Sequence, residues 1–194
     1  MMPRTLIYEP LDDVISDISH ADLLLFSGSY LSSEVIKAAG RSDYSHAGAV
    51  LWIDDIPLSA EATPGGVKIY YLPTRVRDYR GRIDWFRANA NERWPEFSRM
   101  GTGRHLLKLM GNSYGFRGFA KMVLLHMPLF RWFVRPNFND DDQFDPNPIC
   151  SEAVAAAYYF GGGVDPVPKL SSRYTEPGDL ARSPFFKYAC SLEP

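Results

Sequence analysis

The sequence predicts a single α+β domain over residues 1–194, with an antiparallel sheet packed against helices. A chain of 194 residues that is 45% hydrophobic can fill one substantial core. Three apolar runs between residues 46 and 72 are separated by short turn sequences and indicate a strand meander. Stretches with a helical spacing of apolar residues follow that meander. Strands followed by helices along one chain are typical of the α+β class.

The amino-terminal part is predicted to form mainly strands. Residues 22–26, "DLLLF", form an apolar run that ends at "SGS", as expected for a buried strand before a turn. The stretch "SSEVIKAAG", residues 32–40, has the serine cap and the terminal glycine of a short helix. The sequences "DD" and "PGG" then separate the three strands of the meander, at residues 46–53, 56–63 and 67–72.

From residue 78 to about residue 135 the pattern changes to helical spacing, with clusters of arginine and aromatic residues. We expect helices here, and we expect residues of about 78–108 to form a helical insertion within the domain. A polar loop rich in Asp, Asn and Pro, residues 136–148, leads into a further helix. Residues 174–190 predict a turn or short helix followed by an edge strand.

Composition and charge narrow the range of functions. The formal net charge is −2, which does not favour the counterion-releasing contacts of a nucleic-acid-binding protein. A small-molecule, peptide or lipid partner is the better expectation. Cys150 and Cys190 are the two cysteines of the sequence, too few for the disulfide framework of a small secreted domain. We therefore expect reduced thiols.

The sequence predicts neither a membrane-spanning helix nor a secretory signal. The amino terminus lacks a sustained apolar stretch. The most apolar window, Met122–Val134, contains His126, Pro128 and Arg131 and is shorter than the roughly 20 residues that a spanning helix needs. We expect a cytoplasmic protein in which this window either packs on the core or rests on a membrane surface.

Cys150 lies at the predicted start of a helix in "NPICSEAVAAAYYFGGG", residues 147–163. Asn147 is a good N-cap, and Pro148 suits the first helical position. The free N–H groups and the partial positive charge of a helix start favour a thiolate over a thiol. Cys150 is therefore a candidate nucleophile, and a small buried packing residue is the alternative.

A nucleophilic cysteine needs a base, and His46 is the best candidate among the four histidines. It opens a predicted strand that is bounded by polar loop residues. His20 lies in a polar leading segment, whereas His105 and His126 lie in the predicted helical region. The alternative for His46 is a strand-end histidine that hydrogen-bonds a backbone carbonyl.

Strand register connects Glu61 to His46. If "DD" is a two-residue hairpin turn, Ile53 pairs with Ile56, and Gly48 then lies opposite Glu61. Side chains two residues apart share a face, so Glu61 becomes a diagonal neighbour of His46, and Gly48 leaves room between them. A loop of odd length or a bulge would put Glu61 on the other face. Glu61 is thus a candidate to orient the imidazole, and a solvated strand carboxylate is the alternative.

Four stretches, taken together, resemble a known family. They are "SDYSHAGAVLW", "SAEATPGGVKIYYL", "GNSYGF" and "PICSEAVAAAYYFGG". Their order resembles the circularly permuted branch of the NlpC-type papain-like cysteine hydrolases, the YiiX/YebB-like group, in which the histidine precedes the cysteine. "ADLLLF" is similar to the Gly-Asp strand motif of that group, with Ala21 in place of glycine. "EPGDLARS" is similar to its Pro-x-Asp-Leu tail motif.

The resemblance implies a circularly permuted papain-like fold, in which an antiparallel sheet or partial barrel packs against the helix of the nucleophile. It implies that Cys150 is the nucleophile, His46 the general base and Glu61 the orienting acid. It also implies that Tyr114, in "GNSYGF", lines the site near the reacting carbonyl. Read alone, Tyr114 is more often a half-buried core aromatic.

These roles predict a thiol-dependent amidase or peptidase that acts through an acyl-enzyme on a peptide-like or acyl-containing small substrate. No cofactor or metal is expected, because two distant cysteines and scattered histidines do not supply the ligand spacing of a zinc site. One alternative is a lipid-directed acyltransferase or lipase, for which the basic and aromatic stretch at residues 116–135 is the relevant feature. The other is a catalytically idle binding module of the same fold.

Overall fold

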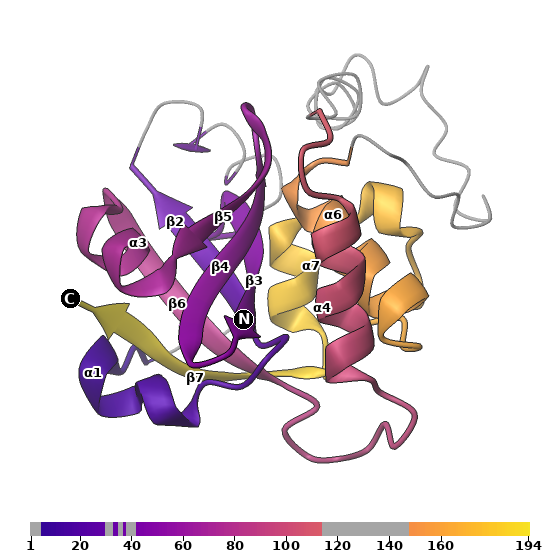
Figure 1. Ribbon diagram of the computed structural model, residues 1–194, viewed down its shortest axis with the longest axis horizontal. Helices are drawn as coiled ribbons and strands as arrows, with labels where there is room; N and C mark the ends of the chain where they lie inside the picture. The colour runs from indigo at the N-terminus through magenta and orange to yellow at the C-terminus, as the bar shows by residue number, and fades with distance from the viewer. Residues whose placement is uncertain (1–4, 30–32, 35–36, 38–41, 114–147) are drawn as a thin grey trace.

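A seven-stranded open sheet forms the centre of the computed structural model (Figure 1). The structure describes residues 5–29, 33–34, 37, 42–113 and 148–194. The strands follow the order β1-β7-β6-β2-β3-β4-β5, so β1 and β5 are the edges. All neighbouring strands are antiparallel except β1 and β7, which are parallel. The strands are β1 (Tyr8–Pro10), β2 (Leu23–Gly28), β3 (His46–Ile53), β4 (Ile56–Thr63), β5 (Gly66–Tyr71), β6 (Gly81–Ala88) and β7 (Phe186–Glu193).

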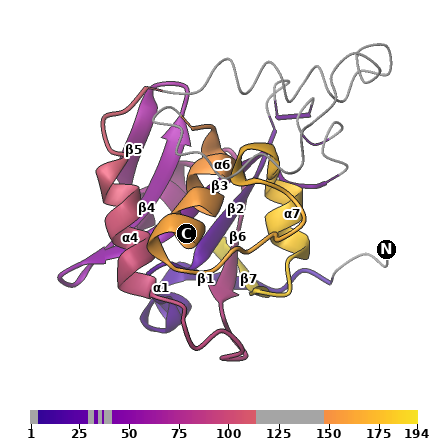
Figure 2. The ribbon, with the colours of Figure 1, turned by 90° about the vertical axis from the view of Figure 1, so that its right-hand side faces the viewer.

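Helices cover both faces of the sheet. In Figure 1, α1 and α3 lie to the left of the strands, and α4, α6 and α7 lie to the right. Figure 2 looks onto the right-hand side and shows α6 between α4 and α7, in front of the strands. The helical segments are α1 (Leu11–Val14), η1 (Ile15–Asp17), α3 (Leu72–Asp78), α4 (Arg99–Lys108), α6 (Cys150–Ala156), η2 (Ala157–Gly161), η3 (Ser172–Tyr174) and α7 (Pro177–Arg182).

The two-sided cover explains the apolar run of β2, which is confirmed as a strand. Leu23 and Leu25 pack into the core on the α6 side, with Val154 and Leu180 among its members. Leu24 and Phe26 pack into the opposite core, together with residues of α1 and α3. A strand that is buried on both faces gains nothing from polar alternation, so its sequence is continuously apolar.

Small side chains bring α6 close to the sheet. Ala153 of α6 shares a buried cluster with Ala62 of β4, and Ala157 of η2, which continues α6, shares another with Ala49 and Ala60. Alanine on both surfaces lets the helix backbone approach the strands, and it loses little side-chain entropy when it is buried. This contact places the amino-terminal end of α6 against β3 and β4.

The meander forms with the predicted register. Ile53 pairs with Ile56 across the "DD" turn, and Gly48 lies opposite Glu61. β5 then pairs antiparallel with β4, which confirms the three-stranded arrangement. Asp54 has a φ of 51°, in the left-handed region that aspartate tolerates at tight turns.

Two predictions about secondary structure are wrong. Residues of about 78–108 were expected to form a helical insertion; Arg99–Lys108 are helical, as α4, but Gly81–Ala88 form β6 in the interior of the sheet. The charges of β6 resemble those of a surface helix, yet Asp84 is buried. It accepts hydrogen bonds from Tyr44 (2.6 Å), Arg82 (2.9 Å) and Ser191 (2.7 Å). The second error concerns β7, which was expected at an edge but lies between β1 and β6.

Ala21 adopts the backbone conformation that favours glycine. Its φ is 60°, in the left-handed region, and the residue is fully buried. Its N–H donates to the Val50 carbonyl (2.7 Å), and its own carbonyl accepts from the Tyr158 hydroxyl (2.6 Å). These bonds hold the turn in place although a Cβ is present. The "EPGDLARS" stretch forms α7, where Leu180 is buried in the core on the α6 side.

Candidate active site

Cys150 is the first residue of α6. The helix begins two residues later than predicted: Ile149 takes the N-cap position, and Pro148 lies before the helix. The Glu152 carboxylate accepts a hydrogen bond from the Ile149 N–H (3.3 Å) and so stabilises this helix start. Asn147, the predicted N-cap, lies outside the described residues. α6 continues directly into η2, so the thiol sits at the start of a helical segment that runs to Gly161.

His46 contacts the Cys150 thiol from the first position of β3. A side-chain hydrogen bond joins the two residues. Ala47 and Ala49 point toward the helices of the α6 side, so His46 points toward the other face of the sheet. The pair therefore meets at the end of the strand, where the backbone of Ala47 also hydrogen-bonds the sulfur.

Glu61 holds the other side of the imidazole. The distance from His46 Nε2 to Glu61 Oε2 is 2.8 Å. Because Nε2 is engaged by the carboxylate, Nδ1 is the ring nitrogen that remains for Cys150. Gly48 makes this contact possible, because a Cβ at that position would lie 2.9 Å from Glu61 Cγ. The structure thus brings together the three residues that the sequence singled out.

Two further residues of the site, Arg75 and Ser59, were not predicted from the sequence. Arg75 of α3 donates to both oxygens of Glu61, from Nε to Oε1 (2.8 Å) and from Nη2 to Oε2 (2.7 Å). The Ser59 hydroxyl donates to Oε1 (2.8 Å). Pro73 near the start of α3 was the sequence signal that a helix, and not a loop, carries this arginine.

The electrostatics of the site favour a thiolate and an imidazolium. Burial opposes the charge on Cys150, but the His46 imidazolium and the backbone of Ala47 and Ser151 hold the pKa of the thiol below its ordinary value. Burial likewise opposes the charge on His46, but Cys150 and Glu61 outweigh it and raise its pKa to about 10. Both shifts favour the charged form of the pair.

Glu61 is ionised although it is almost fully buried. Burial raises the pKa of a carboxyl group, yet His46 and Arg75 lower that of Glu61 to about 2. Its two oxygens accept from three different side chains, so the desolvated charge is compensated. Cys190 provides a contrast, because burial and nearby carboxylates raise the pKa of that thiol to about 11.

The other described histidines have different surroundings. His20 Nδ1 accepts a hydrogen bond from the Trp52 N–H (3.0 Å), and its ring packs against Gly103 of α4. Burial lowers the pKa of His20 and also that of His105, whose ring stacks on Phe160. Neither environment resembles that of His46.

Several predicted features lie outside the described residues. They are Tyr114, His126, the basic and aromatic stretch at residues 116–135, most of the helix predicted at residues 32–40, and almost all of the loop predicted at residues 136–148. The helices of the described segments do not reach the length and apolarity needed to cross a membrane.

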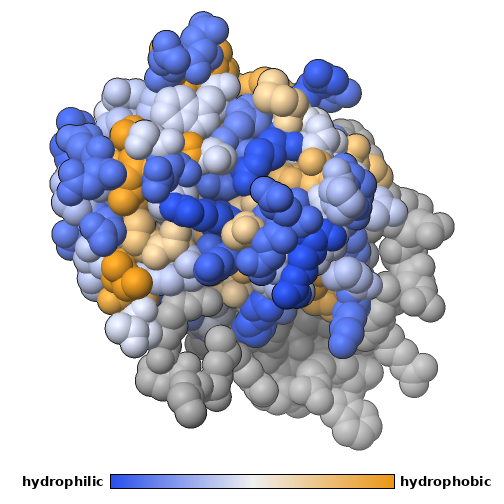
Figure 3. All heavy atoms as spheres, turned by 90° about the horizontal axis from the view of Figure 1, so that it is seen from below, coloured by the Kyte–Doolittle hydropathy of each residue, from blue (hydrophilic) through white to orange (hydrophobic). Residues whose placement is uncertain are grey.

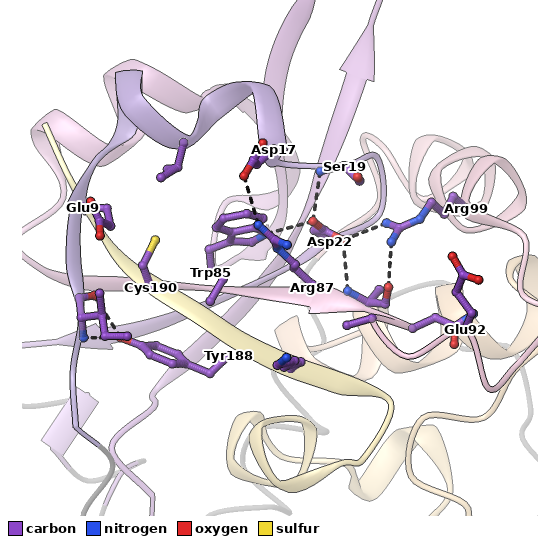
Figure 4. Close-up of a pocket in the computed structure, with 17 residues that line it drawn as sticks. Glu9, Asp17, Ser19, Asp22, Trp85, Arg87, Glu92, Arg99, Tyr188 and Cys190 are labelled. Atoms are coloured by element: carbon purple, nitrogen blue, oxygen red, sulfur yellow. Dashed lines mark hydrogen bonds and ion pairs between the residues drawn. The ribbon is translucent and has the colours of Figure 1, made fainter.

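A separate cavity of about 590 Å³, lined by both polar and apolar residues, lies between β1, β6, β7 and the loop after β6. Its wall contains two ion pairs, drawn in Figure 4, which are Arg87 with Asp17 (3.2 Å) and Arg99 with Asp22 (2.8 Å). Cys150, His46 and Glu61 do not line this cavity. In the view of Figure 3, hydrophilic residues gather over the middle of the molecular surface, with smaller apolar areas between them.

Comparison with known proteins identifies the fold. No protein-family model matches the chain, and no curated protein matches its sequence. A solved structure described as the metalloprotein YiiX from Escherichia coli O157:H7, DUF1105, matches with a TM-score of 0.65. The match covers 91% of this chain and 99% of the other, at 17% sequence identity. The chain has a YiiX-like fold. The fold alone does not define an activity, so the chemistry depends on the residues of this chain.

The description of the YiiX structure as a metalloprotein raises the question of whether the described residues of this chain fit a metal. Within the described ranges, no three His, Cys, Asp or Glu side chains gather as a metal-binding group. Both oxygens of Glu61 already accept hydrogen bonds from Arg75, and a zinc site needs about four ligand atoms free to coordinate. The described residues around Cys150 therefore do not fit a metal centre.

Proposed function

We propose that this protein is a thiol-dependent hydrolase that cleaves an amide bond in a peptide-like substrate through an acyl-enzyme. Cys150 is the nucleophile, His46 the proton carrier and Glu61 the residue that orients His46. The observation that carries the proposal is the chain of contacts from the helix-start thiol to His46 and from His46 to the buried carboxylate. The order His46, Glu61, Cys150 along the chain further supports a circularly permuted papain-like arrangement.

Acylation begins with the thiolate of Cys150, which attacks the carbonyl carbon of the substrate and forms a C–S bond. The carbonyl oxygen becomes an oxyanion. The N–H of Cys150 belongs to the first turn of α6, where no intrahelical acceptor exists, so it can donate to that oxyanion. The imidazolium of His46 then transfers a proton to the leaving nitrogen as the C–N bond breaks, which yields a neutral amine and a thioester.

Deacylation reverses the proton transfer. Neutral His46 accepts a proton from water while the water oxygen attacks the thioester carbonyl. Collapse of the tetrahedral intermediate breaks the C–S bond, releases the carboxylic acid and restores the thiolate. Glu61 stays ionised through both steps and stabilises the imidazolium each time it forms.

The raised pKa of His46 favours an amide as the substrate. Amines are poor leaving groups and depart only when they are protonated, whereas a thiolate leaves a thioester unaided. A His46 that keeps its proton through the neutral range, with a pKa of about 10, supplies the acid that amide cleavage needs.

A panel of matched substrates tests the proposal. Peptide amides, esters and thioesters with the same acyl group are offered to the wild-type protein, to Cys150→Ala and to His46→Ala. We expect Cys150→Ala to lose hydrolysis of all three classes. We expect His46→Ala to lose amide hydrolysis by a larger factor than thioester hydrolysis, with the amide rate reduced at least about 100-fold. Undiminished hydrolysis by Cys150→Ala, or binding without turnover by the wild type, would contradict the proposal.

A further inference from the structure

Arg75 is the cation closest to the carboxylate of the site. Its Nε and Nη2 atoms form a bidentate pair with Glu61, at 2.8 and 2.7 Å, and its side chain is 22% exposed. Bidentate geometry fixes both the position and the plane of a carboxylate. Because Oε2 also accepts from His46, the position of Arg75 determines how the imidazole is held.

Aromatic rings hold the guanidinium itself. The centroids of the Phe26, Tyr70 and Tyr79 rings lie 5.2, 4.9 and 4.9 Å from Arg75 Cζ. These distances fall within cation–π range. Phe26 also lies against His46, with ring centroids 5.0 Å apart, so this one ring contacts both Arg75 and His46. An arginine held on several sides cannot readily leave the carboxylate.

Charge balance gives Arg75 a chemical consequence. In the active form, Arg75 and His46 are positive while Glu61 and Cys150 are negative, and the four charges cancel. The charge on Cys150 interacts with His46, and the charge on Glu61 interacts with His46 and Arg75. Without Arg75 the buried group carries one negative charge in excess, so it binds a proton more readily, at Cys150 or at Glu61.

The other charged groups near the network do not replace Arg75. Lys68 of β5 lies opposite Glu61 in the strand register, but its ammonium lies at the β4–β5 turn, beside Gly65. Glu152 of α6 is buried near Cys150 and would add a further negative charge. Tyr70 and Tyr79 face Arg75 and not the thiol.

We infer that Arg75 is a positioning residue of the active site, which keeps Glu61 ionised and oriented and thereby stabilises the thiolate–imidazolium pair. This inference rests on the proposed function. It adds a fourth member, from α3, to the group formed by Cys150, His46 and Glu61.

The test follows the alkylation of Cys150 by iodoacetamide across pH, with intact-protein and peptide mass spectrometry to assign the labelled thiol. The variants are Arg75→Gln and Arg75→Lys. Arg82→Gln is the matched control, because Arg82 also pairs with a buried carboxylate, that of Asp84, and is 23% exposed. β2 separates that pair from β3. Melting temperatures are measured for every variant.

We expect the acid limb of the Cys150 alkylation profile to move to higher pH by about one unit or more in Arg75→Gln. Arg75→Lys keeps the positive charge but loses the bidentate contact with Glu61. The acid limb of its Cys150 alkylation profile should therefore fall between those of the wild type and Arg75→Gln. Arg82→Gln lowers the melting temperature but leaves the limb in place. If Arg75→Gln does not fold, the inference is tested by Arg75→Lys, whose acid limb of Cys150 alkylation should lie at higher pH than that of the wild type.

An acid limb that stays at the wild-type pH in the folded Arg75 variants would overturn the inference. That outcome differs from failure of the proposed function, in which Cys150 of the wild type would react no faster than Cys190. A limb that moves as much in Arg82→Gln as in Arg75→Gln would also overturn it, because the shift would then reflect general loosening of the fold.

Discussion

Among single residues, Glu61 is the one whose hydrogen bonds set the charge state of the site. Its side chain is fully buried, yet its two oxygens meet donors from Arg75, Ser59 and His46. A buried carboxylate with fewer partners would take up a proton, and a neutral acid could not stabilise an imidazolium. The donors around Glu61 therefore determine the charge state of His46 and, through it, that of Cys150.

Replacing Glu61 by Gln should lower both stability and reactivity. The amide of Gln has one acceptor oxygen, so Arg75 loses one of its two hydrogen bonds to this side chain and remains half-buried without a counter-charge. We expect the free energy of unfolding to fall by about 3 kcal/mol at neutral pH, and the alkylation of Cys150 to slow at least about tenfold. Urea denaturation and alkylation kinetics measure the two effects.

The stability difference between wild type and Glu61→Gln should depend on pH in a defined direction. The pKa of Glu61 is lowered from 4.5 to about 2 in the folded protein, so its ionised form contributes stability that is complete above pH 4.5. That contribution is lost as the pH falls from 4.5 toward 2, and the two proteins should converge there. A difference that stays constant over this range would show that Glu61 is not held ionised by its partners.

At the element scale, the β3–β4 hairpin was the part of the site that the sequence predicted best. A two-residue turn fixes register, so Gly48 and Glu61 could be paired by counting alone. The contact of Cys150 with His46 could not be counted, because it depends on how α6 packs on the strands. Alanines on both surfaces set that distance, and apolar spacing reports only that such residues are buried.

The missed elements share a physical cause. β6 lies in the region that was predicted to be helical, and tertiary partners on β7 and in the segment before β3 satisfy its buried Asp84. Arg75 of α3 follows an apolar strand closely, in a short stretch between the predicted strand at residues 67–72 and the helical region from residue 78 to which no element was assigned. Sequence patterns assign charges to the surface by default, so buried charges with partners distant in sequence are the ones that such patterns miss.

Gly48 provides a test of the hairpin at this scale. A Cβ there would lie 2.9 Å from Glu61 Cγ and 3.0 Å from the Ala60 carbonyl oxygen, so Gly48→Ala must displace the carboxylate side chain. We expect a loss of about 1–2 kcal/mol in stability and a slowing of Cys150 alkylation of about tenfold. Reactivity equal to wild type in the folded variant would show that the Glu61–His46 distance does not control the thiol.

At the scale of the whole molecule, the sheet places the site between two layers of helices. Cys150 begins a helix on one side, whereas Arg75 belongs to α3 on the other (Figure 1). His46 and Glu61 lie on the strands between them and connect the thiolate of Cys150 to the guanidinium of Arg75. The site therefore needs both cores to be formed, and destabilisation on either side of the sheet should alter the reactivity of the thiol.

The proposed mechanism requires Cys150 to be a thiolate paired with the imidazolium of His46. The most direct measurement is the rate of iodoacetamide alkylation of Cys150 and Cys190, followed in one sample as a function of pH. We expect Cys150 to gain reactivity at a lower pH than an ordinary thiol, and Cys190 only toward pH 11. In His46→Ala, Cys150 should lose this advantage. Equal rates and equal pH profiles for the two thiols, unchanged by His46→Ala, would contradict the account.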